Sequence, residues 1–461
     1  MKSSVFVLIV ASVSLAVCNS GSTTADVTSA AVDSGHGEWT WVNGANVAKQ
    51  KGTYGTQGTA APGNVPGARS AAVTWTDAAG NFWLFGGGGY DSAGTGGDLN
   101  DLWKYSAGQW TWMGGSNVFG QKGTYGTQGT AAAGNVPGAR DSAVTWTDAA
   151  GNFWLFGGES DAAGADGYLN DLWEYSAGQW TWMGGSNVVG KKGTYGTQGT
   201  AAAGDVPGAR SAAVSWTDAA GNFWLFGGAG LDSAGMPGLL NDLWKYKAGQ
   251  WTWMGGSKVV DQQGTYGTQG TAGAGNFPGA RSGAGHWIDA GGNFWLFGGF
   301  GFDSAGAWGN LNDVWKYSGG QWTWMGGSNV ADQTGAYGTQ GAAAAGNVPG
   351  ARSTAITWTD GAGNFWLFGG FGCDSAGTQG FLNDLWKYGG GQWTWMGGSN
   401  VVNQEGKYGT QGTAAASNIP GARDVAVAWT DAAGNFWFFG GYGYDSAGTA
   451  GLLNDLWKYE P

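Results

Sequence analysis

The stretch NDLWKYSAGQWTWM (residues 100–113) consists of two short runs rich in aromatic residues, with Ser-Ala-Gly between them. In the second run Trp110 and Trp112 are two residues apart, a spacing that places both side chains on one face of a β-strand. Ser and Gly are residues that tight turns favour. The stretch therefore predicts a β-hairpin, and it decides the fold class because versions of it recur along the chain.

A four-residue motif, PGAR, recurs at nearly constant spacing. Its arginine stands at 69, 140, 210, 281, 352 and 423, so that successive copies are 71, 70, 71, 71 and 71 residues apart. Each copy continues through GNFW, a Gly-Gly pair and NDLW or NDVW. Regular self-similarity on this scale is typical of proteins in which one supersecondary unit is repeated. The sequence thus indicates six copies of one unit.

A second hairpin is predicted within each unit. In SAAVTWTDAAGNFWLFGG (residues 70–87) a β-branched and aromatic run leads into DAAGN, whose residues suit a turn, and NFWLFGG follows as the next run. No stretch shows a sustained helical period between its glycines. Four short antiparallel strands per unit, with aromatics and glycines at fixed places, are typical of a β-propeller blade. We therefore predict an all-β, six-bladed β-propeller.

The two ends of the sequence complete one another. The last unit stops shortly after NDLWKY and lacks QWTW, whereas GEWTWVNG (residues 37–44) has the QWTW-type run without a preceding NDLWKY. If residues 38–42 pair with residues 455–459, the N-terminal strand becomes the fourth strand of the sixth blade, and no sheet edge stays open. We expect the propeller to occupy residues 38–461 and to be closed in this way.

These repeats resemble the kelch repeat, which occurs in kelch propellers and in the central domain of galactose-oxidase-like proteins. The resemblance rests on an arginine that opens the inner strand, a hydrophobic strand that ends in Gly-Gly, and a spaced Tyr and Trp. In the first unit these are Arg69, Gly86-Gly87, Tyr105 and Trp110. The period of about 71 residues is longer than the roughly 50 of kelch units, and the excess lies in the connections between strands.

The long connections emerge on one face of a blade of this topology. They join the second strand to the third and each blade to the next, as residues 114–139 do. Loops on a rigid scaffold commonly carry function, so the long-loop face is the predicted binding surface. The alternative is that these Gly-rich connections are filler without a ligand.

Two sets of repeated residues are candidates for ligand contacts on that face. All six arginines belong to PGAR motifs, where they are expected to ring the channel and form a positive mouth for acidic sugars or carboxylate-bearing peptides. The tyrosines of the YGTQG motifs lie on the long loops. The alternative for the arginines is a scaffold contact with loop carbonyls or with an aspartate such as Asp101. The candidates are Arg69, Arg140, Arg210, Arg281, Arg352, Arg423, Tyr54, Tyr125, Tyr195, Tyr266, Tyr337 and Tyr408.

The N-terminal segment has the features of an export signal. In residues 1–18, Lys2 precedes an apolar run that is too short to span a membrane comfortably. LAVC at residues 15–18 looks like a bacterial lipobox, which would make Cys18 a lipidated N-terminus. Residues 19–37 are small and polar, like a flexible tether. We expect an exported protein, at the cell surface, periplasmic or extracellular, whose membrane contact is limited to a lipid on Cys18.

Charge and residue types argue against several classes of function. The net charge of −12 disfavours nucleic acids and anionic membrane surfaces as partners. Galactose-oxidase-like copper chemistry needs histidine ligands, and the chain has only His36 and His286. We therefore expect no metal and no cofactor. The tryptophans are expected chiefly in the core, although those of the outermost strands could stack on sugar rings.

The sequence favours an exported, monomeric binding module that recognises a glycan or a protein on its long-loop face. The resemblance to kelch-type propellers also implies an alternative, a carbohydrate-active enzyme of the epimerase or oxidase type. Near-identical repeats argue against it, because acid–base catalysis needs groups in different roles, whereas repeats supply the same group six times. A purely structural surface protein is the third alternative.

Overall fold

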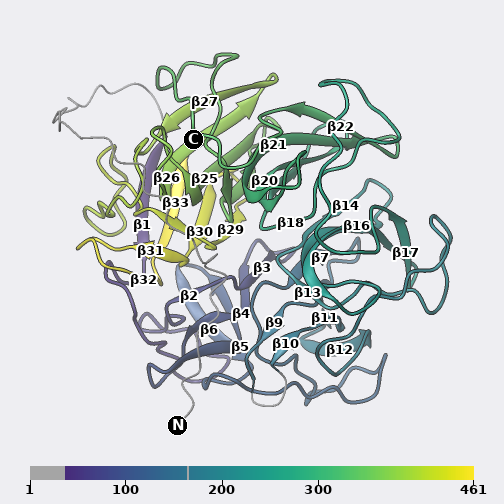
Figure 1. The fold of residues 1–461 in the computed structure, drawn as a ribbon. Helices are drawn as coiled ribbons and strands as arrows, with labels where there is room; N and C mark the ends of the chain where they lie inside the picture. Colours follow the sequence, from purple (N-terminus) through teal and green to yellow (C-terminus); the bar gives the residue numbers. More distant parts are fainter. Residues whose placement is uncertain (1–36, 163–165) are drawn as a thin grey trace, which may run out of the picture. The chain divides into compact units, whose positions relative to one another are not determined.

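The computed structural model describes residues 37–162 and 166–461 (Figure 1). This part of the chain contains β-strands and no helix, so it includes no helical segment that is long and apolar enough to cross a membrane. The strands form antiparallel sheets that follow the sequence repeats. The predicted all-β class is confirmed, and the arrangement is consistent with a β-propeller. The predicted signal and nearly all of the predicted tether, with Cys18, lie outside the described residues.

The first repeat shows the repeating unit. β2 (Arg69–Ser70) and β3 (Val73–Thr76) both pair with β4 (Phe82–Tyr90), β4 pairs with β5 (Gly96–Ser106), and β5 pairs with β6 (Gln109–Gly114). Both predicted hairpins are present. The third, fourth and fifth repeats have the same five strands: β13 (Arg210–Ser211), β14 (Val214–Thr217), β15 (Phe223–Leu231), β16 (Pro237–Lys247), β17 (Gln250–Gly255); β18 (Arg281–Ser282), β19 (Gly285–Ile288), β20 (Phe294–Phe302), β21 (Trp308–Ser318), β22 (Gln321–Gly326); β23 (Arg352–Ser353), β24 (Ile356–Thr359), β25 (Phe365–Cys373), β26 (Gln379–Gly389), β27 (Gln392–Gly397).

In the second and sixth repeats the long middle strands are interrupted, so that each repeat forms a four-stranded sheet and a smaller group of short strands. The second repeat comprises β7 (Val144–Thr147), β8 (Phe153–Phe156), β9 (Glu159–Ser160), β10 (Gly167–Tyr168), β11 (Leu172–Ser176) and β12 (Gln179–Gly184). The sixth comprises β28 (Arg423–Asp424), β29 (Val427–Thr430), β30 (Phe436–Phe439), β31 (Tyr442–Tyr444), β32 (Ala450–Leu452) and β33 (Leu456–Glu460).

A glycine bulge bends each long second strand. In the first repeat the pairing register shifts between Phe85 and Gly87. Gly87 has φ of 93°, and a Cβ atom there would lie 2.6 Å from the carbonyl oxygen of Ser70. A residue with a side chain would be strained in this conformation and would collide with the inner strand. The repeated Gly-Gly pair is therefore needed to turn the strand toward the long-loop face.

The N-terminal strand pairs with the C-terminal strand. β1 (Glu38–Asn43) lies antiparallel to β33, with Trp39 opposite Tyr459 and Trp41 opposite Trp457. Figure 1 shows the purple β1 beside the yellow β33. The sheet order β1-β33-β30-β29 places β1 where the other repeats have their QWTW strand.

Six residues, one per repeat, form a cyclic series of backbone hydrogen bonds. The N–H of each donates to the C=O of its counterpart in the preceding repeat, and the N–H of the first donates to the C=O of the last, over 2.7 to 3.1 Å. All six have a left-handed conformation with φ between 44° and 60°. This hydrogen-bond ring links the first repeat to the sixth through the backbone. It consists of Ala71, Ser142, Ala212, Gly283, Thr354 and Val425.

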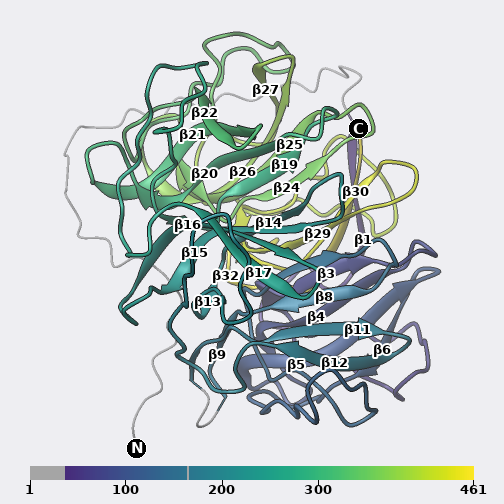
Figure 2. The ribbon, with the colours of Figure 1, turned by 90° about the vertical axis from the view of Figure 1, so that its right-hand side faces the viewer.

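Aromatic side chains fill the space between successive sheets. Trp75 of the first repeat stacks on Phe153 of the second with ring centroids 3.7 Å apart, and four further pairs of this kind lie at 3.5 to 4.0 Å. Between the sixth and first repeats, Trp429 and Phe82 also stack, at 5.3 Å. Figure 2 shows the strands of the first two repeats alongside one another. Core residues of these two repeats form one cluster. Tryptophan is thus the main filler of the core, as the sequence predicts.

Candidate functional site

Each predicted arginine lies in a buried cluster with an aspartate and a tyrosine. In the first repeat, Nη1 and Nη2 of Arg69 donate to the two carboxylate oxygens of Asp101 at 2.6 and 2.7 Å. The Tyr54 hydroxyl donates to the same carboxylate at 2.7 Å, and the guanidinium also donates to two backbone carbonyl oxygens. The cluster therefore ties the preceding connection, the inner strand and the third strand together.

The electrostatics of this cluster are those of a compensated buried ion pair. Neither side chain of the Arg69–Asp101 pair is exposed. Burial alone would lower the pKa of Arg69, but the charge and hydrogen bonds of Asp101 outweigh it, and the pKa is raised. Burial, followed by the Asp101 charge, raises the pKa of Tyr54. Both groups therefore keep their protonated forms, and the positive charge of the arginine is neutralised inside the sheet.

The same arrangement recurs in the other five repeats, with Arg–Asp distances of 2.6 to 2.8 Å. The expectation of a positive, solvent-lined mouth therefore needs correction, because the arginines are buried and paired, and the YGTQG tyrosines are buried or half-buried. This geometry corresponds to the scaffold alternative. The clusters are Arg140–Asp171–Tyr125, Arg210–Asp242–Tyr195, Arg281–Asp313–Tyr266, Arg352–Asp384–Tyr337 and Arg423–Asp455–Tyr408.

The long connections between repeats also have a structural role. In the connection before the first repeat, the N–H of Gly58 donates to the C=O of Trp112 at 2.8 Å, and the amide of Asn64 donates to the C=O of Trp110 at 3.2 Å. Equivalent bonds from the later connections reach the fourth strands of the other repeats. Because an uncovered edge strand invites aggregation, part of the length of these connections serves to cover sheet edges rather than to recognise a ligand.

The positions that differ between repeats are a better guide to function than those that recur. In each repeat, three residues lie directly opposite one another across the inner, second and third strands, close to the hydrogen-bond ring and to the long second-to-third connection. Residues opposed in this way project from the same side of a sheet. We call these triplets the mouth rows: Ser70–Gly88–Asp98, Asp141–Glu159–Tyr168, Ser211–Ala229–Leu239, Ser282–Phe300–Asn310, Ser353–Phe371–Phe381 and Asp424–Tyr442–Leu452.

One part of the mouth rows is aromatic. Phe371 and Phe381 of the fifth repeat have ring centroids 5.4 Å apart, and Phe381 lies 5.4 Å from Tyr442 of the sixth. These three side chains are half-buried. In the fourth repeat, Phe300 lies 5.4 Å from Trp308, which is 56% exposed. The aromatic rings of this region are therefore available for contact, unlike the buried tryptophans of the core.

The rows of the first two repeats are acidic. The backbone N–H of Asp98 donates to the Asp161 carboxylate at 3.2 Å, and the N–H of Asp161 donates to the Asp98 carboxylate at 2.8 Å. Carboxylate oxygens of Asp98 and Asp141 both approach Gly88, at 3.6 and 3.5 Å from the place of a Cβ atom. Glu159 lies opposite Asp141 in its row. These four carboxyl groups therefore join the first repeat to the second.

Burial and mutual repulsion raise the pKa values of these acids. Burial, and then the charges of Asp141 and Asp161, raise the pKa of Asp98 to about 9. Burial and the charge of Asp141 raise the pKa of Glu159 to about 7, and burial raises that of Asp141 to about 6. Burial also raises the pKa of Asp424 to about 7, although a hydrogen bond from Thr354 opposes the rise. The mouth thus contains carboxyl groups that differ in proton affinity near neutral pH.

Other chemically active residues lie apart from these rows. His286 is half-buried on β19, and burial lowers its pKa to about 4, so that its imidazole is neutral. Cys373 is a buried free thiol. Within residues 37–162 and 166–461, no group of three His, Cys, Asp or Glu side chains is arranged to hold a metal ion. His36 lies outside the described residues.

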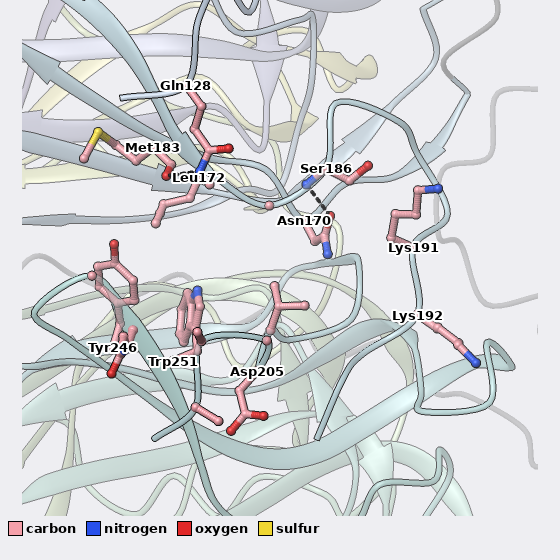
Figure 3. A pocket seen from close by; sticks show the side chains of 18 residues that line it. Gln128, Asn170, Leu172, Met183, Ser186, Lys191, Lys192, Asp205, Tyr246 and Trp251 are labelled. Carbon is pink, nitrogen blue, oxygen red and sulfur yellow. Dashed lines mark hydrogen bonds between the residues drawn. The ribbon is translucent and has the colours of Figure 1, made fainter. Parts of the chain in front are cut away.

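A cavity of about 440 Å³ opens between the second and third repeats (Figure 3). Leu172 and Met183 line one side of it, and Tyr246 and Trp251 line the other. Asp205 also borders it and has a buried carboxylate oxygen without a hydrogen-bond partner, but in Figure 3 its carboxyl group points away from the opposite wall. The mouth rows therefore remain the better candidate for a ligand site.

Comparison with known proteins assigns no family to this chain. No family model matches the chain, and no curated protein matches it. Among solved structures, the structure of YjhT is similar, with 14% identity and a TM-score of 0.49 over 85% of this chain and 95% of that chain. A fungal alcohol oxidase of the AA5 family, solved in complex with copper, is similar with 13% identity and a TM-score of 0.44 over 88% of this chain and 77% of that chain. At these values the likeness carries no argument.

Proposed function

We propose that this protein is a binding module that recognises a glycan at the mouth rows of its long-loop face. The observation that supports this proposal is the contrast within the repeats: the Arg–Asp–Tyr clusters are the same in all six, whereas the neighbouring mouth rows are aromatic in some repeats and acidic in others. A scaffold repeated six times has no structural need for such variation. Half-buried aromatic rings beside polar groups are suited to sugars, which present both an apolar ring face and hydroxyl groups.

The architecture in this proposal is a six-bladed propeller in which residues 38–42 complete the sixth blade. The pairing of β1 with β33 and the hydrogen-bond ring that joins Ala71 to Val425 support it. A closed ring holds the rows at fixed distances, so a ligand would meet a preorganised surface.

The proposed location is outside the cytoplasm. The apolar run after Lys2 and the small polar residues 19–37 support export and a tether. In this proposal Cys18 is acylated, and the module otherwise has no contact with the membrane. Expression in a bacterium with a labelled fatty acid should label the protein, and Cys18→Ala should release it from membranes. Labelling that survives the substitution would contradict the proposal.

A carbohydrate-active enzyme is the second candidate, and the acidic rows favour it. Asp98 and Asp141 are close together and differ in pKa, about 9 against about 6, which is the kind of difference that lets one carboxyl group act as an acid and another as a base. Formation of a product from a bound glycan would distinguish an enzyme from a binding module. A purely structural surface protein would bind no glycan.

A glycan array probed with the mature domain tests the proposed function. We expect binding to one class of glycan and loss of that binding in Phe371→Ala and Tyr442→Ala. Met236→Ala is the matched control, because Met236 is a 59% exposed apolar residue in the second-to-third connection of the third repeat, outside the mouth rows. Absence of binding across the array, or binding that both aromatic substitutions leave unchanged, would contradict the proposal.

A further inference from the structure

The aromatic part of the mouth forms a continuous platform across two repeats. Phe371, Phe381 and Tyr442 follow one another with centroid distances of 5.4 Å, and Tyr444 lies 6.2 Å from Phe381. We call these four residues the aromatic platform. The side chains are half-buried, so each has one covered and one accessible part. A set of linked rings of this kind presents an apolar surface that nothing in the described residues covers completely.

One carboxylate belongs to the platform. Asp424 lies directly opposite Tyr442 across β28 and β31, so the two side chains project from the same side of the sheet. Its Oδ2 accepts a hydrogen bond of 3.1 Å from the hydroxyl of Thr354, a member of the hydrogen-bond ring. The other repeats have Ser at this position, except the second, which has Asp141. The carboxylate is thus fixed beside the platform rather than free to turn into solvent.

Asp424 supplies the negative charge of the platform: burial raises its pKa to about 7, and an ammonium group beside it favours the ionised form. The arginines nearest to the rows are neutralised in their buried pairs. Lys49 lies next to Gly451 at the edge of the sixth repeat, where it is exposed to solvent. The rings of the platform are inclined to one another by 46° to 72°, so the platform with Asp424 offers several apolar ring surfaces and a negative group side by side.

We propose that the aromatic platform binds a glycan built from amino sugars with free amino groups. This inference rests on the proposed function and specifies its ligand class. A pyranose ring can stack on one of the aromatic rings, and its ammonium group can pair with the carboxylate of Asp424, which complements its charge. The same negative charge repels carboxylated sugars, so acidic glycans, the ligands that a positive mouth would have suited, are disfavoured here.

The test compares two oligosaccharides that differ only in N-acetylation. Isothermal titration with a hexasaccharide of glucosamine and with the matching hexasaccharide of N-acetylglucosamine should show at least about tenfold tighter binding of the free amine form, which corresponds to about 1.4 kcal/mol. In Asp424→Asn the two affinities should come within about twofold of each other, and Phe381→Ala should weaken both by about tenfold. Glu38→Gln removes one negative charge from the exposed start of β1 and serves as the charge control.

The outcomes separate this inference from the proposed function. Equal binding of the two hexasaccharides by the unsubstituted protein would overturn the inference while leaving glycan binding intact. The same conclusion would follow if neither hexasaccharide bound but another glycan on the array did. A preference for the free amine that persists in Asp424→Asn would assign the ammonium site to other residues and also overturn it. The two hexasaccharides can be compared with the unsubstituted protein alone. The inference therefore stays testable even if a variant folds poorly.

Discussion

Arg210 and Asp242 form a bidentate ion pair that is withdrawn from solvent: two N–H···O hydrogen bonds of 2.6 and 2.7 Å join them, and at most 1% of either side chain is exposed. The Tyr195 hydroxyl and the Trp244 indole nitrogen donate to the same carboxylate. Four donors thus converge on one aspartate. The pair joins the inner strand of the third repeat to its third strand. The five counterparts in the other repeats have the same partners.

Removal of one such arginine should destabilise the protein strongly. In Arg210→Ala and Arg352→Ala the partner aspartate keeps its charge in a buried site and loses its main counter-charge, so unfolding should become easier by about 3–5 kcal/mol. Urea unfolding measures this. Lys122→Ala, at an exposed position, is the control and should stay within about 0.5 kcal/mol. Near-native stability in both arginine variants would return these residues to the candidates for ligand binding.

The repeated pattern could be predicted from the sequence because it depends on local rules. The hairpins follow from strand patterning within a single repeat, and the terminal strand pair follows from the runs that the two ends of the chain lack. The partner of Arg69 was harder to choose, since it lies 32 residues away on the third strand and depends on how strands meet in space. The sequence offered a scaffold contact with Asp101 as an alternative to a ligand contact, and geometry favours the former.

The mouth rows were not predicted, and the reason is physical. Asp98, Asp141 and Glu159 come from two repeats and meet only when the sheets are packed. A signal was nevertheless present: Asp141 stands where four repeats have Ser, and Glu159 follows a Gly-Gly pair that other repeats continue with Gly, Ala or an aromatic residue. Departures from the repeat, rather than the repeat itself, mark such a site.

A single substitution in the third repeat should stabilise the protein. In the other five repeats the amide of an asparagine, such as Asn276, donates to two backbone carbonyls of the fourth-strand edge and its covering connection. Asp205 occupies this place in the third repeat and is 7% exposed, with one carboxylate oxygen unpaired. Asp205→Asn restores the two donors, and the free energy of unfolding should rise by about 1–3 kcal/mol.

The reverse substitution is the matched experiment. Asn276→Asp should lower the free energy of unfolding by a similar amount, because it creates the same unpaired carboxylate in the fourth repeat. Both variants can be compared by urea unfolding at pH 7. A destabilised Asp205→Asn would show that Asp205 has a compensating role that its contacts do not reveal.

Stability should fall as the pH rises from about 4 to about 9. Asp98 and Glu159 have folded-state pKa values raised to about 9 and about 7, above the ordinary values near 4. A raised pKa means that the folded protein holds the proton more tightly than the unfolded chain, so this contribution is complete below pH 4 and is lost as the pH passes the folded value. Asp98→Asn removes the main titrating group and should flatten the decline.

Asp77 provides a control because its pKa is shifted in the opposite direction, below the ordinary value. Burial opposes its ionisation, but hydrogen bonds from Asn81, Trp83 and nearby backbone N–H groups outweigh this effect and lower its pKa. Its contribution is therefore present above the ordinary pKa and is lost at more acidic pH. Asp77→Asn should leave the slope between pH 5 and 9 unchanged in thermal unfolding. A slope that Asp98→Asn also leaves unchanged would contradict the role given to the acidic rows.

Loss of the N-terminal strand should open the sixth sheet. Deletion of residues 19–42 removes most of β1, including Trp39, which packs 4.8 Å from Tyr459. The edge of β33 would then be exposed, so a much lower melting temperature and concentration-dependent oligomers are expected. Scanning calorimetry and light scattering measure these effects. A deletion variant that stays monomeric with an unchanged melting temperature would contradict closure by this strand.

If recurring residues build the scaffold while the mouth rows bind the ligand, Phe381→Ala should lose affinity for the ligand and keep its fold. Phe381 lies 5.4 Å from both Phe371 and Tyr442, at the centre of the aromatic platform. Isothermal titration with the tightest glycan of the array should show at least about tenfold weaker binding than to the unsubstituted protein, with a cooperative unfolding transition retained. Unaltered affinity in a folded Phe381→Ala protein would contradict the account.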